Sequence, residues 1–170
     1  MYCIESDPEV KCYMDGPVRV PREEWIRGVK SNLFRHQTLA VLAKDTGQFA
    51  GRAALDPYLD SDYLDAEVTR EIQVIISKDY RGRYFGREVC KILIGAAFDE
   101  LGAEQVIGVV HPQNEHCLKL LRIFGYEQKG VVSKPSPWQQ GHLRFVLSRD
   151  VYRKWPQELR CATCQPTETD

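Results

Sequence analysis

Residues 71–88 of the chain read EIQVIISKDYRGRYFGRE. The apolar run at 72–76 is typical of a buried strand, and the loop that follows it carries two glycines, Gly82 and Gly86, among several arginines. Glycines leave backbone N–H groups accessible, and a helix N-terminus with cations nearby attracts phosphate. The loop has neither the Gly-Lys-Ser/Thr of a Walker loop nor a G-x-G-x-x-G fingerprint. It is therefore either a phosphate site or a tight turn with solvated arginines.

The rest of the chain places further strands and helices on both sides of this stretch. Apolar periodicity and turn residues predict helices at about residues 21–33, 86–101 and 114–124, and strands at about 39–43, 49–55, 68–77, 105–110, 126–133 and 142–148. The strand–helix–strand unit over 68–110 predicts parallel strands, and the hairpins on either side predict antiparallel ones. The predicted fold class is α/β (α+β), with a mixed, mostly antiparallel sheet and flanking helices.

The composition is that of one soluble globular domain. Of the 170 residues, 43% are hydrophobic and 28% are charged, which is enough to build a core. The net charge of -1 argues against nucleic acid or an anionic membrane as a partner. No apolar run approaches a membrane span, and the first residues lack the blocks of a signal peptide, so we expect a cytoplasmic protein.

The six cysteines suggest a different class of protein. Cys161 and Cys164 form a CxxC pair, but Cys3 and Cys12, which would complete a site, do not have the spacing of a zinc knuckle. In a reducing cytosol these thiols are expected to stay free. A small zinc or redox protein is therefore the weaker alternative, and no metal is expected.

Two blocks of the sequence together resemble a known family. Residues 71–88 are similar to the central strand and pyrophosphate loop of the GNAT superfamily of acyl-CoA-dependent N-acetyltransferases, whose loop follows the pattern Q/R-x-x-G-x-G/A. Residues 111–126, HPQNEHCLKLLRIFGY, are similar to the family's P-x-N-x-x-S/A with the helix and Gly-Phe that follow it. Residues 7–14 and the helix around Trp25 extend the likeness, over about residues 6–148, to the branch that acetylates protein N-termini, ribosomal proteins among them.

The resemblance implies a GNAT-like twisted sheet whose central parallel strands splay apart. It implies one acetyltransferase domain over residues 1–149, without the first strand of its relatives, and a C-terminal helix or tail over 150–170. Two positions depart from the family pattern. Tyr84 stands where the loop has its middle glycine, and Leu121 stands where many relatives have the tyrosine that protonates the thiolate.

Acetyl-CoA, or coenzyme A, is the cofactor that the resemblance implies. Backbone N–H groups of the loop would hold the pyrophosphate, and the splayed strand would take the pantetheine arm. The residues assigned to cofactor binding in this way are Val74, Ile75, Ile76, Arg81, Gly82, Arg83, Tyr84, Phe85, Gly86, Arg87 and Asn114.

The same resemblance assigns three residues to catalysis. Glu71 matches the position often proposed as general base, which an amine with a pKa of about 10 requires; the alternative is an ordinary exposed glutamate. Cys117 takes the place of a serine proposed as proton donor, or is a small core residue. Asn114 would bind pantetheine or order a water, and also suits a helix N-cap. His111 and His116 are expected on the surface.

The acceptor side has one informative segment. Residues 56–67, DPYLDSDYLDAE, hold five acids and no base. By resemblance they lie near the acceptor mouth and would favour a cationic amine such as a protein N-terminus, a polyamine or an aminoglycoside; the alternative is a solvated loop. We expect an enzyme that moves an acetyl group from acetyl-CoA to a primary amine by direct transfer. The alternative is a non-catalytic acyl-CoA-binding or regulatory module on the same fold, and a homodimer is left open.

Overall fold

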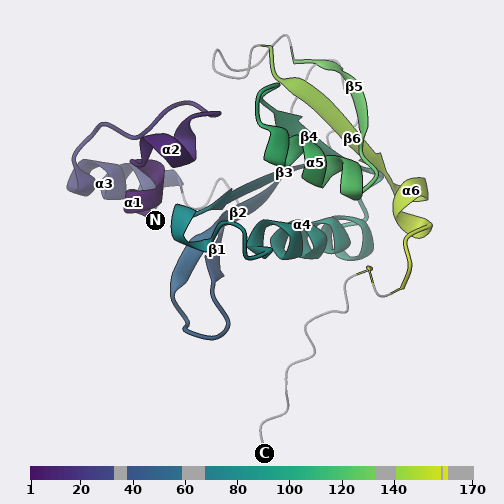
Figure 1. Cartoon of the computed structure of the whole chain (residues 1–170), viewed down its shortest axis with the longest axis horizontal. Helices are drawn as coiled ribbons and strands as arrows, with labels where there is room; N and C mark the ends of the chain where they lie inside the picture. The colour runs from purple at the N-terminus through teal and green to yellow at the C-terminus, as the bar shows by residue number, and fades with distance from the viewer. Residues whose placement is uncertain (33–37, 59–67, 133–140, 158, 161–170) are drawn as a thin grey trace, which may run out of the picture.

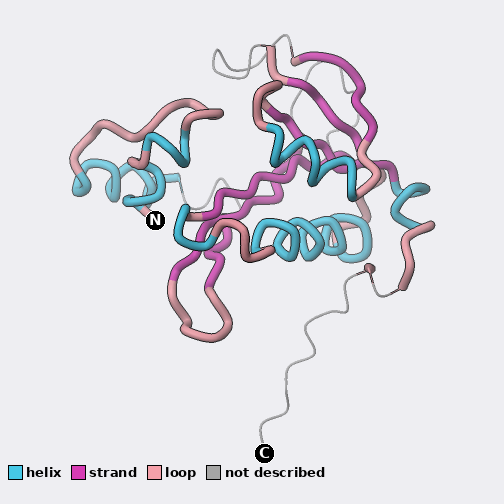
Figure 2. The backbone as a smooth tube through the Cα atoms, viewed as in Figure 1, coloured by secondary structure: helices cyan, strands magenta, loops and turns pink. Residues whose placement is uncertain are grey.

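The computed structural model describes residues 1–32, 38–58, 68–132, 141–157 and 159–160. Three helices precede the sheet: α1 (Tyr2–Glu5), α2 (Pro8–Lys11) and α3 (Arg22–Asn32). The strands are β1 (Thr38–Leu42), β2 (Phe49–Pro57), β3 (Thr69–Ile76), β4 (Gln105–Val110), β5 (Glu127–Val131) and β6 (Leu143–Ser148). The remaining α-helices are α4 (Phe85–Gly95), α5 (Glu115–Ile123) and α6 (Arg149–Arg153). Figures 1 and 2 show α4 and α5 over one face of the sheet and the N-terminal helices beside its β1–β3 half.

The described strands form one six-stranded sheet in the order β1-β2-β3-β4-β6-β5. Neighbouring strands are antiparallel except β3 and β4, which are parallel because α4 carries the chain back between them. The prediction of a mixed, mostly antiparallel sheet with a central parallel pair and flanking helices is confirmed.

The central parallel pair opens like a V. β3 pairs with β4 only at its start, from Thr69 opposite Gln105 to Glu71 opposite Ile107. On its other side, β3 pairs with β2 as far as Ile76. The second half of β3 therefore has a partner strand on one side only, which is the splay that the family resemblance implies.

The main core lies between the sheet and the helices α4 and α5. Side chains at helical spacing on α4 and the turn after it enter this core, among them Ile94, Ala97 and Phe98, which are at most 1% exposed. The ring of Phe98 stacks on Tyr152 of α6 with the ring centroids 4.7 Å apart, and the Tyr152 hydroxyl donates a hydrogen bond to Asp99. The described start of the C-terminal segment thus packs on the core.

The helices differ from the prediction in two places. The helix expected over 86–101 is α-helical only to Gly95 and then makes a π-helical turn, Ala96–Glu100. The sequence does not predict α1 and α2, because four residues are too few for a periodic apolar pattern. Local chemistry defines α2 instead: Asp7 at its N-cap accepts a hydrogen bond from the Glu9 N–H at 2.9 Å, and a proline occupies its first position.

Candidate active site

Glu71 lies at the point of the V. It is the last residue of β3 that pairs with β4, and on its other side it lies opposite Asp56 of β2. Burial, and then the negative charge of Asp56, raise the pKa of Glu71 to about 7. Such a carboxylate binds a proton more strongly than an ordinary glutamate and is still partly ionised at neutral pH, which suits a general base.

Beyond Glu71, the residues assigned to the pantetheine arm line one limb of the V. Val74 packs against the main core, and Ile75 is 4% exposed. The stretch 74–76 pairs with β2, and on the side of β4 it has no partner strand among the described residues. Backbone N–H and C=O groups on that side still require hydrogen-bond partners. An extended ligand with amide groups, such as a pantetheine arm, fits this requirement.

The loop after β3 enters α4 in a strained backbone conformation. It passes through a 3-10 turn, Lys78–Tyr80, and reaches the helix with Tyr84 at φ 64° and ψ 1°. Among the residues that the structure describes, Tyr84 alone combines a side chain with a positive φ. This region of backbone space favours glycine, so Tyr84 keeps the backbone shape of the glycine that the family pattern has there.

The start of α4 offers backbone donors to an anion. The first N–H groups of a helix have no acceptor within the helix, and Tyr84 at the N-cap gives them no side-chain hydrogen bond. Gly86 leaves room in front of this turn, because the nearest atom that a Cβ there would meet is Cγ1 of Ile76, at 3.9 Å. Gly82 has φ 73°, and a Cβ there would meet no atom within 4 Å. Helices bind phosphate at such a place, where N–H groups of the first turn lack acceptors and no side chain stands in front of them.

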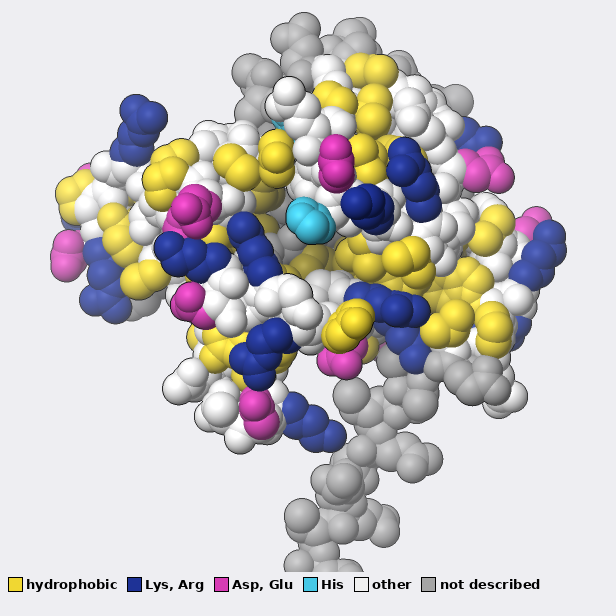
Figure 3. Space-filling model, viewed as in Figure 1, with side chains coloured by type: hydrophobic (Ala, Val, Ile, Leu, Met, Phe, Trp, Pro, Cys, Tyr) yellow, Lys and Arg dark blue, Asp and Glu magenta, His cyan; other side chains and the backbone are white. Residues whose placement is uncertain are grey.

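Arg83 in this loop has contacts of its own. Its guanidinium lies 5.4 Å from the ring centroid of Tyr80 and 5.6 Å from that of Phe85, and it is 3.7 Å from a carboxylate oxygen of Asp45. Arg87 is exposed. Figure 3 shows Lys and Arg side chains around the junction between the N-terminal helices and the start of α4. Exposed ion pairs of this kind are weak, so a phosphate can replace them at little cost.

Asn114 and Cys117 lie on the other limb of the V, where β4 leads into α5. Asn114 is the N-cap of α5, and its Oδ1 accepts a hydrogen bond from the Cys117 N–H at 3.2 Å. Burial raises the pKa of Cys117 to about 11, so the side chain is a protonated thiol at neutral pH. Leu121 is 5% exposed and lies close over Gly108, which makes it a core residue.

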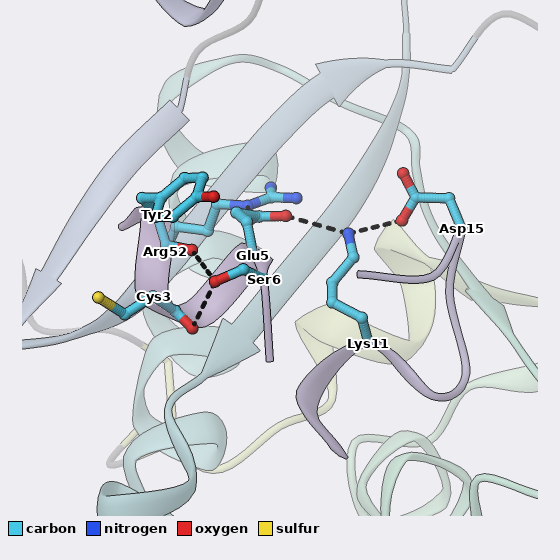
Figure 4. Close-up of polar contacts among 7 residues, drawn as sticks. All are labelled: Tyr2, Cys3, Glu5, Ser6, Lys11, Asp15 and Arg52. Atoms are coloured by element: carbon cyan, nitrogen blue, oxygen red, sulfur yellow. Dashed lines mark hydrogen bonds and ion pairs between the residues drawn. The ribbon is translucent and has the colours of Figure 1, made fainter. Parts of the chain in front are cut away.

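A strap formed by residues 5–15 is anchored to the sheet by a buried network of charges, drawn in Figure 4. Lys11 is 2% exposed, and its Nζ lies 3.0 Å from Glu5 and 2.6 Å from Asp15. Glu5 also accepts a hydrogen bond from Arg52 of β2. Glu5 and Lys11 are buried and Arg52 is half-buried, and their opposite charges pair, which is the condition for charged groups to leave water.

The strap begins beside the loop that follows β3. A carboxylate oxygen of Asp7 lies 3.4 Å from Nζ of Lys78. The backbone carbonyl of Glu9 accepts a hydrogen bond from Arg81 at 3.5 Å. Lys78 and Arg81, two cations of this loop, therefore contact the strap.

The strap ends beside the carboxyl end of β4. The Tyr13 ring lies 5.3 Å from that of His111, which follows β4 directly, and the Tyr13 carbonyl oxygen lies 3.3 Å from Nε2 of His142. The strap thus connects the ends of both splayed strands. His111 is half-buried beneath it, which differs from the surface position predicted, whereas His116 is exposed as predicted. These contacts join residues that are distant in the sequence, so no local motif signals them.

Some predicted features lie outside the described residues. Of the acidic segment 56–67 the structure describes residues 56–58, and the CxxC pair at 161 and 164 is not among the described residues. The cysteines with free thiols in the described part are Cys3, Cys12, Cys90 and Cys117. Within the same residues there is no group of three or more side chains suited to a metal ion. The described helices include none that is long and apolar enough to cross a membrane.

Comparison with known proteins identifies the family. Residues 1–127 match the acetyltransferase (GNAT) domain. A spermidine N-acetyltransferase from Vibrio cholerae, solved in complex with CoA and spermine, has a TM-score of 0.72 at 15% identity over 89% of each chain. A GNAT-family acetyltransferase from Bacillus anthracis has a TM-score of 0.69 at 18% identity, over 86% of this chain and 84% of that one.

A candidate ribosomal-protein-serine acetyltransferase from Vibrio cholerae has a TM-score of 0.59 at 17% identity, over 74% of this chain and 72% of that one. At these identities the likeness to solved structures is one of fold. The family match is broader evidence, because it runs through the V, the loop and α5. The chain belongs to the GNAT family of acetyltransferases, which use acetyl-CoA.

Proposed function

We propose that the chain transfers an acetyl group from acetyl-CoA to the nitrogen of a cationic primary amine. The observation that carries this proposal is Glu71, a carboxyl group with a pKa of about 7 at the point where the central strands diverge. Acetyl-CoA supplies the acetyl group as a thioester. The protein has to hold the cofactor, take a proton from the amine and return one to the sulfur.

The residues along the V and its loop fit coenzyme A. The N–H groups at the start of α4, beside Gly86, would bind the pyrophosphate. Arg81, Arg83 and Arg87 are exposed and would pair with its negative charge; Arg81 and Arg83 would first leave their contacts with Glu9 and Asp45. The pantetheine amides would bind residues 74–76 on the side of β3 that lacks a partner strand.

Two side chains on opposite limbs of the V would move protons. An ammonium group with a pKa of about 10 cannot attack until it loses a proton, and Glu71 would take it directly or through a water. The nitrogen then bonds to the acetyl carbon, while a backbone N–H near Val74 stabilises the charge on oxygen. As the carbon–sulfur bond breaks, the Cys117 thiol would give its proton to the sulfur. The second proton that the nitrogen loses on becoming an amide would pass through water to the Cys117 thiolate, and Glu71 would release the first proton to solvent. Asn114, on the same turn, would order that water or hold the pantetheine.

The charge around Glu71 supports a cationic acceptor. Asp56 adds a second carboxylate directly opposite Glu71, and such a pair attracts a positively charged amine. A polyamine, a protein N-terminus and an aminoglycoside all meet this requirement. The spermidine N-acetyltransferase of similar fold was solved with spermine, which supports testing polyamines first.

A second candidate is a non-catalytic acyl-CoA-binding or regulatory module. It is favoured by Leu121, a buried side chain without a proton to donate, and by the strained Tyr84 in the loop. Such a module would bind acetyl-CoA through the same loop and leave it intact.

Calorimetry with acetyl-CoA, followed by mass spectrometry of an amine panel, separates the two candidates. Spermidine, a peptide with a free N-terminus and an aminoglycoside would be incubated separately with the protein and acetyl-CoA. Mass detection is preferable to thiol reagents, because Cys3 and Cys12 are exposed free thiols. Acetylation of one amine supports the enzyme and names its substrate class. Binding without acetylation of any amine supports the module, and no binding contradicts both.

Gly86→Val tests the phosphate loop. The new side chain has room beside Ile76 but would stand in front of the N–H groups, so acetyl-CoA affinity should fall at least tenfold, about 1.4 kcal/mol, without unfolding. Gly28→Val on α3, where a Cβ meets no atom within 4 Å, is the control and should bind normally. Normal affinity in Gly86→Val, measured by calorimetry, would remove the loop from the cofactor site.

A further inference from the structure

Asp56 and Glu71 form a pair across the antiparallel ladder of β2 and β3. They lie directly opposite each other in register, so both side chains point to the same face, with Cβ atoms about 5 Å apart. Glu71 is also the last residue of β3 that pairs with β4. The two carboxyl groups therefore lie side by side where the V begins to open.

The face that carries this pair is otherwise mainly apolar next to Glu71. Ile107 lies opposite Glu71 on β4 and is buried with Tyr58 and Val146. Among the described residues, the other charged or titratable side chains that this face presents are Tyr58 and Arg52 on β2, Arg144 on β6, Glu127 on β5 and Glu5 on the strap, with His111 and His142 beside the ends of β4 and β6. Arg52 is bound to Glu5, and Arg144 lies opposite Val109, beyond Ile107 along β4. Asp56 is thus the carboxylate placed to act on Glu71.

We propose that Asp56 is a positioning residue of acetyl transfer: its carboxylate makes Glu71 a stronger base and draws the ammonium group of the acceptor toward it. The inference rests on the proposed function, because it assigns to Asp56 an effect on the proposed base. It adds a residue whose role depends on register rather than on any sequence motif.

The chemistry follows from repulsion between two like charges. Two carboxylates at this separation disfavour being ionised together, and the pair is relieved when one of them binds a proton or when a cation approaches. A protonated amine provides both in turn. It first enters as a cation, and then gives its proton to Glu71 and becomes the nucleophile. The negative charge of Asp56 contributes, second to burial, to the raised pKa of Glu71.

The test compares Asp56→Asn with the wild type in two measurements. The first is the titration midpoint of the Glu71 carboxyl carbon, followed by NMR in the free protein. The second is the pH profile of kcat/KM for whichever amine of the panel, spermidine, peptide or aminoglycoside, is acetylated. We expect Asp56→Asn to lower the midpoint by roughly 0.5 to 1 pH unit and to move the acidic limb of the profile by the same amount.

Two further variants separate charge from structure. Asp56→Glu keeps the charge and should restore a profile close to that of the wild type. Asp150→Asn makes the same charge change on exposed α6, where Asp150 pairs with Arg153, and should move neither measurement. A loss of activity in Asp56→Asn without a shift along the pH axis would identify a structural role and overturn the proposal.

The remaining outcomes are distinguishable. An unchanged Glu71 midpoint in Asp56→Asn overturns the inference, and if Glu71→Gln is then inactive the proposed base still stands. A shifted midpoint with an unshifted profile also overturns it. If, in addition to either of these results, Glu71→Gln is fully active, the proposal that Glu71 is the base fails too. Acetylation of no amine contradicts the proposed function and this inference together.

Discussion

Glu71 and Tyr84 both adopt states that cost the folded protein free energy. Tyr84 holds a left-handed backbone conformation, and Glu71 has lost much of the water that would stabilise its charge. Tyr84 lies in the loop proposed to bind the pyrophosphate, and Glu71 lies where the amine is proposed to react. Strain of this kind is common where function, rather than stability, selects the conformation.

Tyr84→Gly should relieve the backbone strain. A left-handed residue with a Cβ costs about 1 kcal/mol, which glycine avoids, although glycine also loses more entropy on folding. We therefore expect a free energy of unfolding equal to or up to about 1 kcal/mol above that of the wild type, with tighter binding of acetyl-CoA. Tyr84→Ala keeps the Cβ and should show neither gain. Urea unfolding and calorimetry check both variants, and a gain in Tyr84→Ala would contradict the account.

Glu71→Gln should show a stability that depends on pH relative to the wild type. Because the folded state binds the Glu71 proton more tightly than the unfolded state, this group stabilises the wild type below pH 4.5 and loses that contribution as the pH rises through about 7. The variant has no such loss, so it should be more stable than the wild type at pH 8, by on the order of 2 kcal/mol. The difference should shrink toward pH 4, and an equal difference at both pH values would argue against a raised pKa.

At the scale of elements, the site is assembled from parts that meet around the V. β3 and α4 supply the loop, β4 and α5 supply Asn114 and Cys117, and the strap crosses the open end. The strap contains one very short helix, α2, which would not be stable alone. Its position depends on the network of Glu5, Lys11 and Arg52, which is buried against the sheet.

Glu5→Gln should detach the strap. It removes the buried carboxylate shared by Lys11, which is buried, and Arg52, which is half-buried, and breaking a buried pair costs about 3 kcal/mol or more. Lys11 has a second partner, Asp15, whose carboxylate side chain is 52% exposed. Asp15→Asn removes that exposed partner and should cost less than about 1 kcal/mol. Urea unfolding measures both. Equal losses in the two variants would show that burial does not determine the strength of the network.

At the scale of the whole molecule, one core holds the V in place. Side chains from β2, β4, β6, α4, α5 and α6 belong to a single buried cluster. Phe98 is central to it, because its ring lies in the turn after α4 and stacks on Tyr152 of α6. The spacing between the strands therefore depends on packing far from Glu71.

Phe98→Ala should destabilise the entire fold. Removing a fully buried aromatic ring typically lowers the free energy of unfolding by roughly 3–5 kcal/mol, because apolar burial is lost and a cavity is left behind. Ile123→Ala removes an apolar side chain of α5 that is 61% exposed and should change the free energy of unfolding by less than about 0.5 kcal/mol. Thermal and urea unfolding would check both variants, and each curve should show one cooperative transition. A small loss in Phe98→Ala would mean that the core tolerates the cavity.

The sequence by itself determined the order of the elements and the two motif blocks around the V. Local signals were sufficient there: the apolar run at 72–76 in β3, helical periodicity in α4, and glycines at residues 82 and 86. Asn114 at the start of α5 could also be predicted as an N-cap, because capping is a contact between near neighbours. Short range is the physical reason that these features could be derived from the chain alone.

Tertiary structure decided the rest. The pKa of Glu71 depends on burial and on Asp56, which register places opposite it across β2 and β3. The path of the strap depends on ion pairs between residues such as Glu5 and Arg52, which are 47 positions apart. Charges and registers of this kind act through space, and their strength depends on how much water the fold excludes. Only folding brings these groups together and removes water from around them.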